Sequence, residues 1–365
     1  MPVLRVVIAA GGTAGHVVPA LAVADALAEA GAQVSFMGTR ERAEASLVPA
    51  AGYEIDFLAV RGIDRRNPIR AAGALARAAA AVRVARRLLR ARRADVVMGG
   101  GGYVAAPAGL AALSLGLPIV LTEADSHLGL ANRLLAPRAE RVCLAFGVPG
   151  REGERYVLTG RPVPAAILNA DRSAARERYG IAAGDRCVLI FGGSLGARTI
   201  NLAAAEAFGP ANTDARRAAR DFHVLHIAGS RDYLELTERL EGAEHYTLLE
   251  YEPDLGDALA ASDLVLARSG GSVFELTAAG RPAILVPYPF ASAGHQHANA
   301  AWMEEAGAAR VVEDSEVTPE RLTAEIAHLL DDPERLAAMA AASLALARPD
   351  AAVRIADEIL QAGAA

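Results

Sequence analysis

Residues 6–16 read VVIAAGGTAGH, an apolar run that ends in glycine and other small residues before an Ala- and Leu-rich segment begins. We predict a buried strand over residues 6–10, a turn over residues 11–15 and a helix over residues 19–30, which Gly31 ends. A second apolar run follows at residues 33–37. Strands that alternate with helices in this way indicate a parallel sheet with helices on both faces.

The same pattern restarts halfway along the chain. Residues 187–197 read CVLIFGGSLGA, and an Ala-rich segment follows at residues 198–207. A chain of 365 residues is long enough for about two domains. We therefore predict the α/β class, with two doubly wound Rossmann-like domains facing across a cleft. In such folds ligands bind outside the carboxyl ends of the strands.

The domain limits follow from a Pro-rich join at residues 158–164. We expect an N-terminal domain at residues 1–163 and a C-terminal domain at residues 164–345. Residues 346–365 carry a last helix with no strand after it, and we expect this helix to pack back on the N-terminal domain.

The composition excludes several classes of protein. Hydrophobic residues make up 53% of the chain and charged residues 22%, which rules out disorder and collagen. The net charge of −6 argues against a general nucleic-acid binder. Every basic residue is Arg, so a phosphate-binding loop that ends in Lys is absent. The two cysteines, Cys143 and Cys187, have no metal-type spacing and fit a reduced, cytosolic setting.

Two apolar segments resemble targeting or membrane sequences. The first eight residues are too short for a signal peptide, and we interpret them as the start of the first strand. Residues 104–121 carry no charge but contain two prolines and two glycines. We interpret them as a buried helix at about 105–115 and a strand at 117–122.

Four glycine-rich segments follow predicted strands, at residues 11–16, 99–103, 192–197 and 267–275. Small residues let a backbone approach a phosphate or a sugar, and the amino end of a helix favours anions. The segments at residues 11–16 and 192–197 could instead be turns that only packing requires, and the segment at residues 99–103 could be a flexible loop. Glu275 could accept hydrogen bonds from two ribose hydroxyls, or could simply complement a helix dipole.

A polar cluster follows the Pro-rich segment at residues 287–290 and contains His295, Gln296, His297 and Asn299. Two histidines two residues apart make a poor metal site, and these groups suit the recognition of sugar hydroxyls better. No Asp-x-Asp motif occurs in the chain, so a metal-dependent diphosphate site of that kind is not supported.

A basic segment spans residues 61–93, with eleven arginines and one acidic residue, Asp64. It is either a solvated helix face or a face that docks on anionic lipid. RNA binding is less favoured because no aromatic residue is interleaved. The candidate membrane-facing residues are Arg65, Arg66, Arg70, Arg83, Arg86 and Arg87.

Taken together, these motifs resemble the MurG-type glycosyltransferases of peptidoglycan synthesis, which have the GT-B fold and belong to glycosyltransferase family 28. The resemblance covers about residues 4–345, with the motifs in the family's order. The matching segments are residues 11–16, 99–104, 192–197, 268–275, 278–282, Gln296 and 299–300.

The resemblance implies an inverting transfer of N-acetylglucosamine from UDP-N-acetylglucosamine to lipid I, the undecaprenyl-diphosphate-linked muramoyl pentapeptide, to give lipid II. His16 is the candidate base because an imidazole titrates near neutral pH, and Glu123 is its rival. No metal or other cofactor is implied. The implied substrate-binding residues are Thr13, Ala14, Gly15, Asp125, Arg161, Ser194, Gly271, Ser272, Glu275, Gln296 and Asn299.

The same resemblance implies a peripheral protein on the cytoplasmic face of the cell membrane. Its partners would be UDP-N-acetylglucosamine, lipid I, the anionic inner-membrane surface and the cell-wall synthesis machinery, but no nucleic acid. The chain departs from the family pattern at three places. Asp125 stands where the family commonly has Asn, and the segment between Arg268 and Glu275 is one residue shorter than in the family. The family's Arg at the position of Pro164 is missing, and an arginine, Arg161, stands before Pro162 instead. The alternatives are a GT-B transferase with another acceptor, a UDP-N-acetylglucosamine 2-epimerase, and a protein that only binds UDP-sugars.

Overall fold

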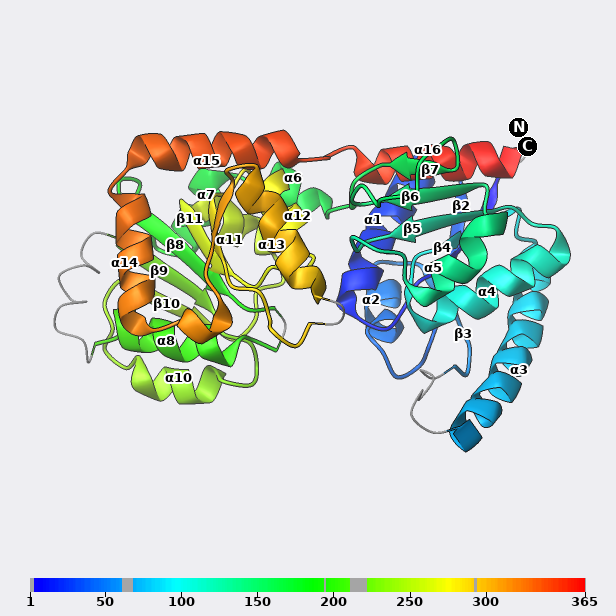
Figure 1. Cartoon of the computed structure of the whole chain (residues 1–365), viewed down its shortest axis with the longest axis horizontal. Coiled ribbons are helices and arrows are strands. Elements are labelled where there is room, and N and C mark those ends of the chain that lie inside the picture. Colours follow the sequence, from blue (N-terminus) through cyan, green and yellow to red (C-terminus); the bar gives the residue numbers. More distant parts are fainter. Residues whose placement is uncertain (1–2, 61–67, 194, 211–221, 292–293, 365) are drawn as a thin grey trace. The chain divides into compact units, whose positions relative to one another are not determined.

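The computed structural model describes residues 3–60, 68–193, 195–210, 222–291 and 294–364. It divides the chain into two units, Met1–Pro164 with Arg348–Ala365, and Ala165–Ala347. Each unit contains one parallel sheet with helices on both faces (Figure 1). The predicted α/β class with two doubly wound Rossmann-like domains is confirmed.

The N-terminal unit has a seven-stranded sheet in the order β3-β2-β1-β4-β5-β6-β7. All of its neighbouring strands are parallel. The strands are β1 (Arg5–Ala9), β2 (Gln33–Gly38), β3 (Glu54–Phe57), β4 (Val96–Gly99), β5 (Ile119–Glu123), β6 (Arg141–Leu144) and β7 (Tyr156–Leu158).

Helices cover both faces of this sheet. One apolar core lies under α3, α4 and α5, and the other lies under α1 and α16, whose Ile355 and Ile359 are fully buried. The helices are α1 (Ala14–Glu29), α2 (Glu44–Ala50), α3 (Pro68–Arg92), α4 (Gly102–Leu115), α5 (Leu130–Leu135), the 3-10 turn η1 (Ala136–Arg138) and α16 (Ala351–Ala364).

The first helix begins five residues before its predicted start, at Ala14 rather than at residue 19. The prediction took Pro19 as a first-turn residue, where proline is common. In the structure Pro19 lies inside α1 and cannot donate a backbone hydrogen bond to Gly15. The side chain of Arg161, which lies outside the helix, donates a hydrogen bond to the Gly15 carbonyl oxygen instead.

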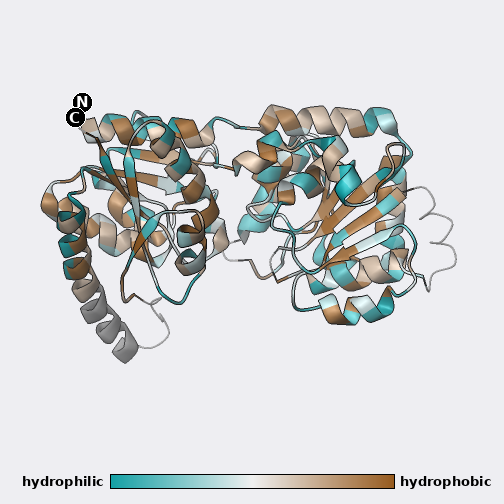
Figure 2. Cartoon of the chain, turned by 180° about the vertical axis from the view of Figure 1, so that it is seen from behind, coloured by the Kyte–Doolittle hydropathy of each residue, from teal (hydrophilic) through white to brown (hydrophobic). Residues whose placement is uncertain are grey.

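The C-terminal unit has a six-stranded sheet in the order β10-β9-β8-β11-β12-β13, again parallel throughout. The strands are β8 (Arg186–Phe191), β9 (Phe222–Ile227), β10 (Tyr246–Leu249), β11 (Leu264–Ala267), β12 (Ala283–Leu285) and β13 (Ala309–Val311). They carry mostly apolar residues, as Figure 2 shows.

The helices of this unit close its core, with α8 and α14 against one face of the sheet. They are α6 (Ala165–Asn169), α7 (Arg172–Arg178), α8 (Arg198–Phe208), α10 (Tyr233–Arg239), α11 (Leu255–Ala261), α12 (Val273–Ala278), α13 (His295–Glu305), the 3-10 turn η3 (Asp314–Glu316), α14 (Pro319–Leu330) and α15 (Pro333–Leu346).

In both sheets the strand order reverses beside the first strand of the unit. The reversal lies between β1 and β4 in one sheet and between β8 and β11 in the other. Ligands of open α/β sheets bind in the crevice at this switch point, at the carboxyl ends of the strands. The four glycine-rich segments of the sequence follow these four strands, so each unit places two of them at its switch point.

The apolar segment at residues 104–121 forms the buried helix, turn and strand that were predicted. By length and hydropathy alone, one helical stretch in the described part of the chain, Pro333–Ala364, could cross a membrane. It comprises α15 and α16, which extended backbone at Ala347 separates. Because α16 buries Ile355 and Ile359 in the core, packing accounts for its apolar face.

Candidate active site

The first site lies at the switch point of the N-terminal unit, where the turn after β1 meets the turn after β4. A Cβ atom on Gly102 would lie 1.9 Å from the carbonyl oxygen of Gly11, and one on Gly101 would lie 2.6 Å from Cδ2 of His16. Both positions also have positive φ angles, +76° and +88°. Glycine is therefore required here because the two turns and the imidazole touch.

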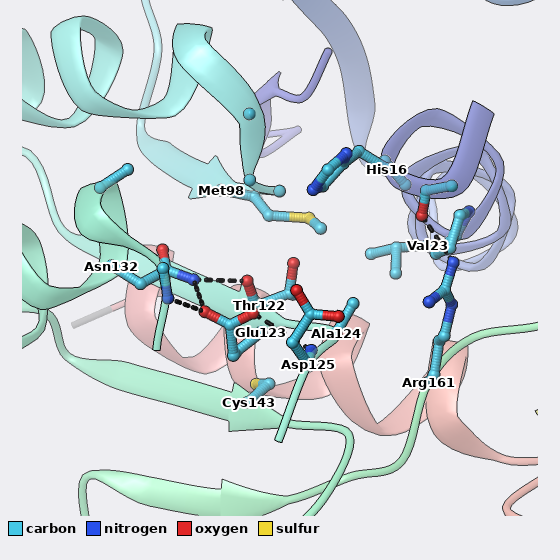
Figure 3. A pocket seen from close by; sticks show the side chains of 18 of the residues that line it. His16, Val23, Met98, Thr122, Glu123, Ala124, Asp125, Asn132, Cys143 and Arg161 are labelled. Atoms are coloured by element: carbon cyan, nitrogen blue, oxygen red, sulfur yellow. Dashed lines mark hydrogen bonds between the residues drawn. The ribbon is translucent and has the colours of Figure 1, made fainter. Parts of the chain in front are cut away.

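A cavity of about 750 Å³ opens beside these turns, within the N-terminal unit. Five of the predicted site residues line it: Gly15, His16, Glu123, Asp125 and Arg161. Figure 3 shows His16 from α1 and Glu123 from the end of β5 lining this cavity. Apolar side chains form much of the remaining wall: Pro19, Ala20, Val23, Val60, Met98, Tyr103, Pro107, Leu130, Cys143 and Ile355.

His16 is half-buried, and its Nδ1 lies 3.2 Å from the hydroxyl oxygen of Thr13. Burial lowers the pKa of His16, and the charge of Arg161 lowers it further, whereas Asp125 and Glu44 raise it. The net shift is downward, so the imidazole is neutral at neutral pH. A neutral imidazole at a cavity wall can accept a proton from a bound hydroxyl.

Glu123 is only 8% exposed and accepts three hydrogen bonds. Its Oε2 accepts from the Gly129 amide at 2.7 Å and from Asn132 Nδ2 at 2.9 Å, and its Oε1 accepts from the Asp125 amide at 3.2 Å. Burial raises the pKa of Glu123 more than these donors lower it. Both oxygens are thus engaged in holding the loop after β5.

Arg161 reaches back to the first turn. Its Nη2 donates a hydrogen bond to the Gly15 carbonyl oxygen at 2.7 Å. Two further predicted residues, Thr13 and Ala14, are exposed at the start of α1 and lie next to the cavity rather than in its wall. The N-terminal unit therefore gathers the predicted residues around one turn.

The second site lies at the switch point of the C-terminal unit. The turn after β8 packs on the segment after β9, since a Cβ atom on Gly196 would lie 1.9 Å from the carbonyl oxygen of Ala228. Ser194 of this turn lies outside the described residues. Behind the turn, Asn201 donates hydrogen bonds to Ala228 at 2.8 Å and to Asp232 at 2.9 Å.

The turn after β11 is held by α13. Ser269 Oγ donates to the Gln296 carbonyl oxygen at 2.7 Å, and Asn299 Nδ2 donates to the Ser269 carbonyl oxygen at 3.0 Å. The structure thus brings Gln296 and Asn299 next to the turn that contains Gly271 and Ser272. Glu275 follows in the first turn of α12 and is half-buried.

Comparisons with known proteins decide the family. Residues 6–144 match the glycosyltransferase family 28 N-terminal domain, and residues 187–355 match the glycosyltransferase family 28 C-terminal domain. The chain belongs to glycosyltransferase family 28. The resemblance inferred from the motifs is confirmed.

Relatives of this family 28 chain extend over its full length. The UDP-N-acetylglucosamine--N-acetylmuramyl-(pentapeptide) pyrophosphoryl-undecaprenol N-acetylglucosamine transferase of Mycobacterium avium is 41% identical, over 99% of this chain and 89% of that protein. The protein of the same name from Acidithiobacillus ferrooxidans is 43% identical, over 96% of both. The crystal structure of Acinetobacter baumannii MurG has 30% identity and a TM-score of 0.78, and the match covers 99% of this chain and 100% of that chain.

The family 28 motifs did not point to two buried residues of the N-terminal site. Glu44 is fully buried beneath the first turn, and Asn132 is 3% exposed beside Glu123. In the sequence Glu44 ends a charged run, RERAE at residues 40–44, which looks like a solvated surface. The signal that could have revealed Glu44 is its place between the strand that ends at Gly38 and an apolar helix.

The titratable side chains of the described residues do not gather into a metal-binding group. Within the described residues, no group of three or more His, Cys, Asp and Glu side chains could hold a metal ion. His297, from the polar cluster, lies 3.3 Å from Glu313. The side chains described at the two sites can transfer protons and make hydrogen bonds.

Proposed function

We propose that this chain transfers N-acetylglucosamine from UDP-N-acetylglucosamine to the 4-hydroxyl of the muramoyl unit in undecaprenyl-diphosphate-linked muramoyl pentapeptide. The curated relatives at 41–43% identity are named for this transfer. The observation that carries the proposal is His16, a half-buried imidazole in the wall of a cavity of about 750 Å³.

The reaction needs one base. The acceptor oxygen attacks the anomeric carbon, its proton passes to His16, and the bond from that carbon to the UDP oxygen breaks with inversion. We favour His16 over Glu123 because three hydrogen bonds occupy the Glu123 oxygens. A base with a pKa near the working pH is the most effective one.

The donor is proposed to bind at the turns of the C-terminal unit. Glu275 would accept hydrogen bonds from the ribose, and Gln296 and Asn299 would hold the N-acetylglucosamine. Asn299 Oδ1 is buried and has no hydrogen-bond partner among the described residues, so it keeps an unused acceptor. The leaving diphosphate would be stabilised by helix amino ends and by either Ser194 or Arg161, without a metal.

The acceptor's lipid implies a membrane surface, and α3 is the proposed docking face. Ala81, Ala85 and Leu89 form its buried stripe, whereas the side chains of Arg83, Arg86, Arg87 and Arg90 are exposed. Arg65 and Arg66 lie outside the described residues, as does the side chain of Arg70. Anionic lipid attracts such a face by about 1 kcal/mol for each basic side chain.

The proposed localisation is the cytoplasmic face of the cell membrane. The proposed protein partners are those of the cell-wall synthesis machinery, and a pull-down experiment tests this contact. The deciding experiment is UDP release from UDP-N-acetylglucosamine, with and without a lipid I analogue, in EDTA. Acceptor-dependent release supports the proposal. Bound donor without acceptor-dependent release contradicts the acceptor assignment, and release without acceptor favours hydrolysis or epimerisation.

A further inference from the structure

Glu44 is a buried carboxylate that joins two turns of the N-terminal unit. It begins α2 and is 0% exposed. Its Oε1 accepts hydrogen bonds from the Thr39 amide at 2.9 Å and from the Thr39 hydroxyl at 2.7 Å, and its Oε2 accepts one from the Gly12 amide at 2.9 Å. One side chain thus ties the end of β2 to the turn after β1.

The space around Glu44 is fitted to this side chain. A Cβ atom on Gly11 would lie 2.5 Å from Glu44 Oε1, and one on Gly38 would lie 2.5 Å from Glu44 Cγ. Burying a carboxylate costs several kcal/mol unless hydrogen bonds compensate for the lost water. Here three donors supply that compensation, and two glycines provide the room.

The contacts continue from this carboxylate to the imidazole. Glu44 fixes Gly11 and Gly12, the Gly11 carbonyl oxygen packs against Gly102, and Gly101 packs against the His16 ring. Resting on the proposed function, we propose that Glu44 is a positioning residue for the transfer reaction: its hydrogen bonds fix the turn that orients His16.

Electrostatics agree with this role. Burial raises the pKa of Glu44, but hydrogen bonds from Thr39 and Gly12 lower it further than burial raises it, so the carboxylate is ionised at neutral pH. Among the described residues, three charged groups act on His16: Arg161 after β7, Asp125 after β5 and Glu44 from α2. Glu44 and Asp125 thus oppose the effect of Arg161.

The test is Glu44→Gln, with Glu41→Gln as the matched control. Glutamine has the same shape as glutamate but only one oxygen acceptor. If that oxygen accepts from Thr39, the NH₂ group of the glutamine faces the Gly12 amide, and two donors then oppose each other. Glu41 is exposed three residues earlier, so its neutralisation removes the same charge without these contacts. Thr39→Val is the second variant, because it removes one donor and keeps the carboxylate.

The readouts are kcat, the donor KM, the pH profile of kcat/KM, and the pKa of His16 from histidine NMR, assigned with His16→Gln. For Glu44→Gln we expect kcat to fall about tenfold with donor KM within about twofold, and the His16 pKa to move downward. Thr39→Val should lower kcat by a smaller factor, and Glu41→Gln should leave all four readouts unchanged.

An unchanged His16 pKa and an unchanged kcat in Glu44→Gln would overturn the proposal. If Glu44→Gln does not fold, Thr39→Val decides: wild-type kcat and wild-type His16 chemical shifts would overturn it. The NMR readout does not depend on turnover. A shifted His16 pKa together with full activity of His16→Ala would keep the coupling of Glu44 to His16 and remove His16 from the base role.

Discussion

Arg161 supplies the hydrogen bond that Pro19 cannot. In α1 the Gly15 carbonyl oxygen would accept from the amide of residue 19, but proline has no amide hydrogen. Arg161 Nη2 donates to this oxygen at 2.7 Å across 146 residues of sequence. The guanidinium thereby sits beside His16 and lowers its pKa.

Removal of this guanidinium should therefore make His16 more basic. In Arg161→Gln we expect the acidic limb of the kcat/KM profile to move to higher pH, because the imidazolium loses a repulsive neighbour. At a pH below the His16 pKa, the variant should therefore keep a smaller fraction of its plateau activity than the wild type does. The measurement is the full profile from pH 5 to 9, normalised to its plateau. A limb at the wild-type position would show that Arg161 does not act on the titrating group.

The base role of His16 can be tested directly. His16→Ala should lower kcat by about 10² or more with little change in donor KM, because general-base catalysis contributes that much and the donor is proposed to bind elsewhere. His127→Ala is the control, since His127 follows β5 near the cavity without lining it. If His16→Ala turned over at close to the wild-type rate, His16 would not be the base, and Glu123 would become the candidate.

A buried histidine in the C-terminal unit makes stability depend on pH. His226 is 0% exposed, its Nδ1 lies 2.7 Å from the Tyr246 hydroxyl oxygen, and its Nε2 lies 3.0 Å from Asn201 Oδ1. Because Asn201 Nδ2 donates to Ala228 and Asp232, Oδ1 is an acceptor, and Nε2 must carry the hydrogen. Burial lowers the pKa of His226 to about 3, against the pull of Asp232.

The folded protein loses stability as the pH falls, because of His226. In the unfolded chain His226 has a pKa of about 6.5, so it binds a proton below that pH. In the folded chain His226 stays neutral until the pH falls to about 3. This contribution to stability is complete above pH 6.5 and is lost as the pH falls toward 3, at about 2 kcal/mol between pH 6.5 and 5. Urea unfolding of wild type and His226→Gln at both pH values measures it. Equal pH dependence in the two proteins would contradict the assignment.

The arginine face of α3 predicts membrane binding that depends on charge. Replacing Arg83, Arg86, Arg87 and Arg90 by Glu should lower partitioning onto anionic vesicles at least a hundredfold, at about 1 kcal/mol for each side chain. Arg92 is left in place because it pairs with Asp56 at 2.7 Å and with Glu54. Neutral vesicles and added salt are the controls. Undiminished binding of the quadruple variant to anionic vesicles would mean that another surface docks.

The sequence predicted the turns better than the contacts that hold them. Glycine and small residues after a buried strand mark a turn because few other residues permit such a backbone, and all four turns lie at switch points. The predicted start of α1 at residue 19 was wrong. Pro19 leaves the Gly15 carbonyl oxygen without its helical hydrogen bond, and Arg161, 146 residues away in sequence, donates one to it instead. Glu44 was missed for the same reason: it follows the exposed residues Glu41 and Arg42, and only the folded chain brings Gly12 to it.

The glycines of the turn after β4 make room for the neighbouring turn after β1. From the sequence alone, we expected them to let the backbone approach a ligand. In the structure a Cβ atom on Gly102 would meet the Gly11 carbonyl oxygen at 1.9 Å. Gly102→Ala should therefore cost about 3 kcal/mol or more, through strain at φ +76° and through displacement of the first turn. Gly116→Ala is the matched control, since Gly116 has φ +70° with no atom within 4 Å of the added methyl group, and it should cost about 1 kcal/mol. Thermal unfolding of both variants measures the difference, and equal losses would show that the two turns can separate to accept the methyl group.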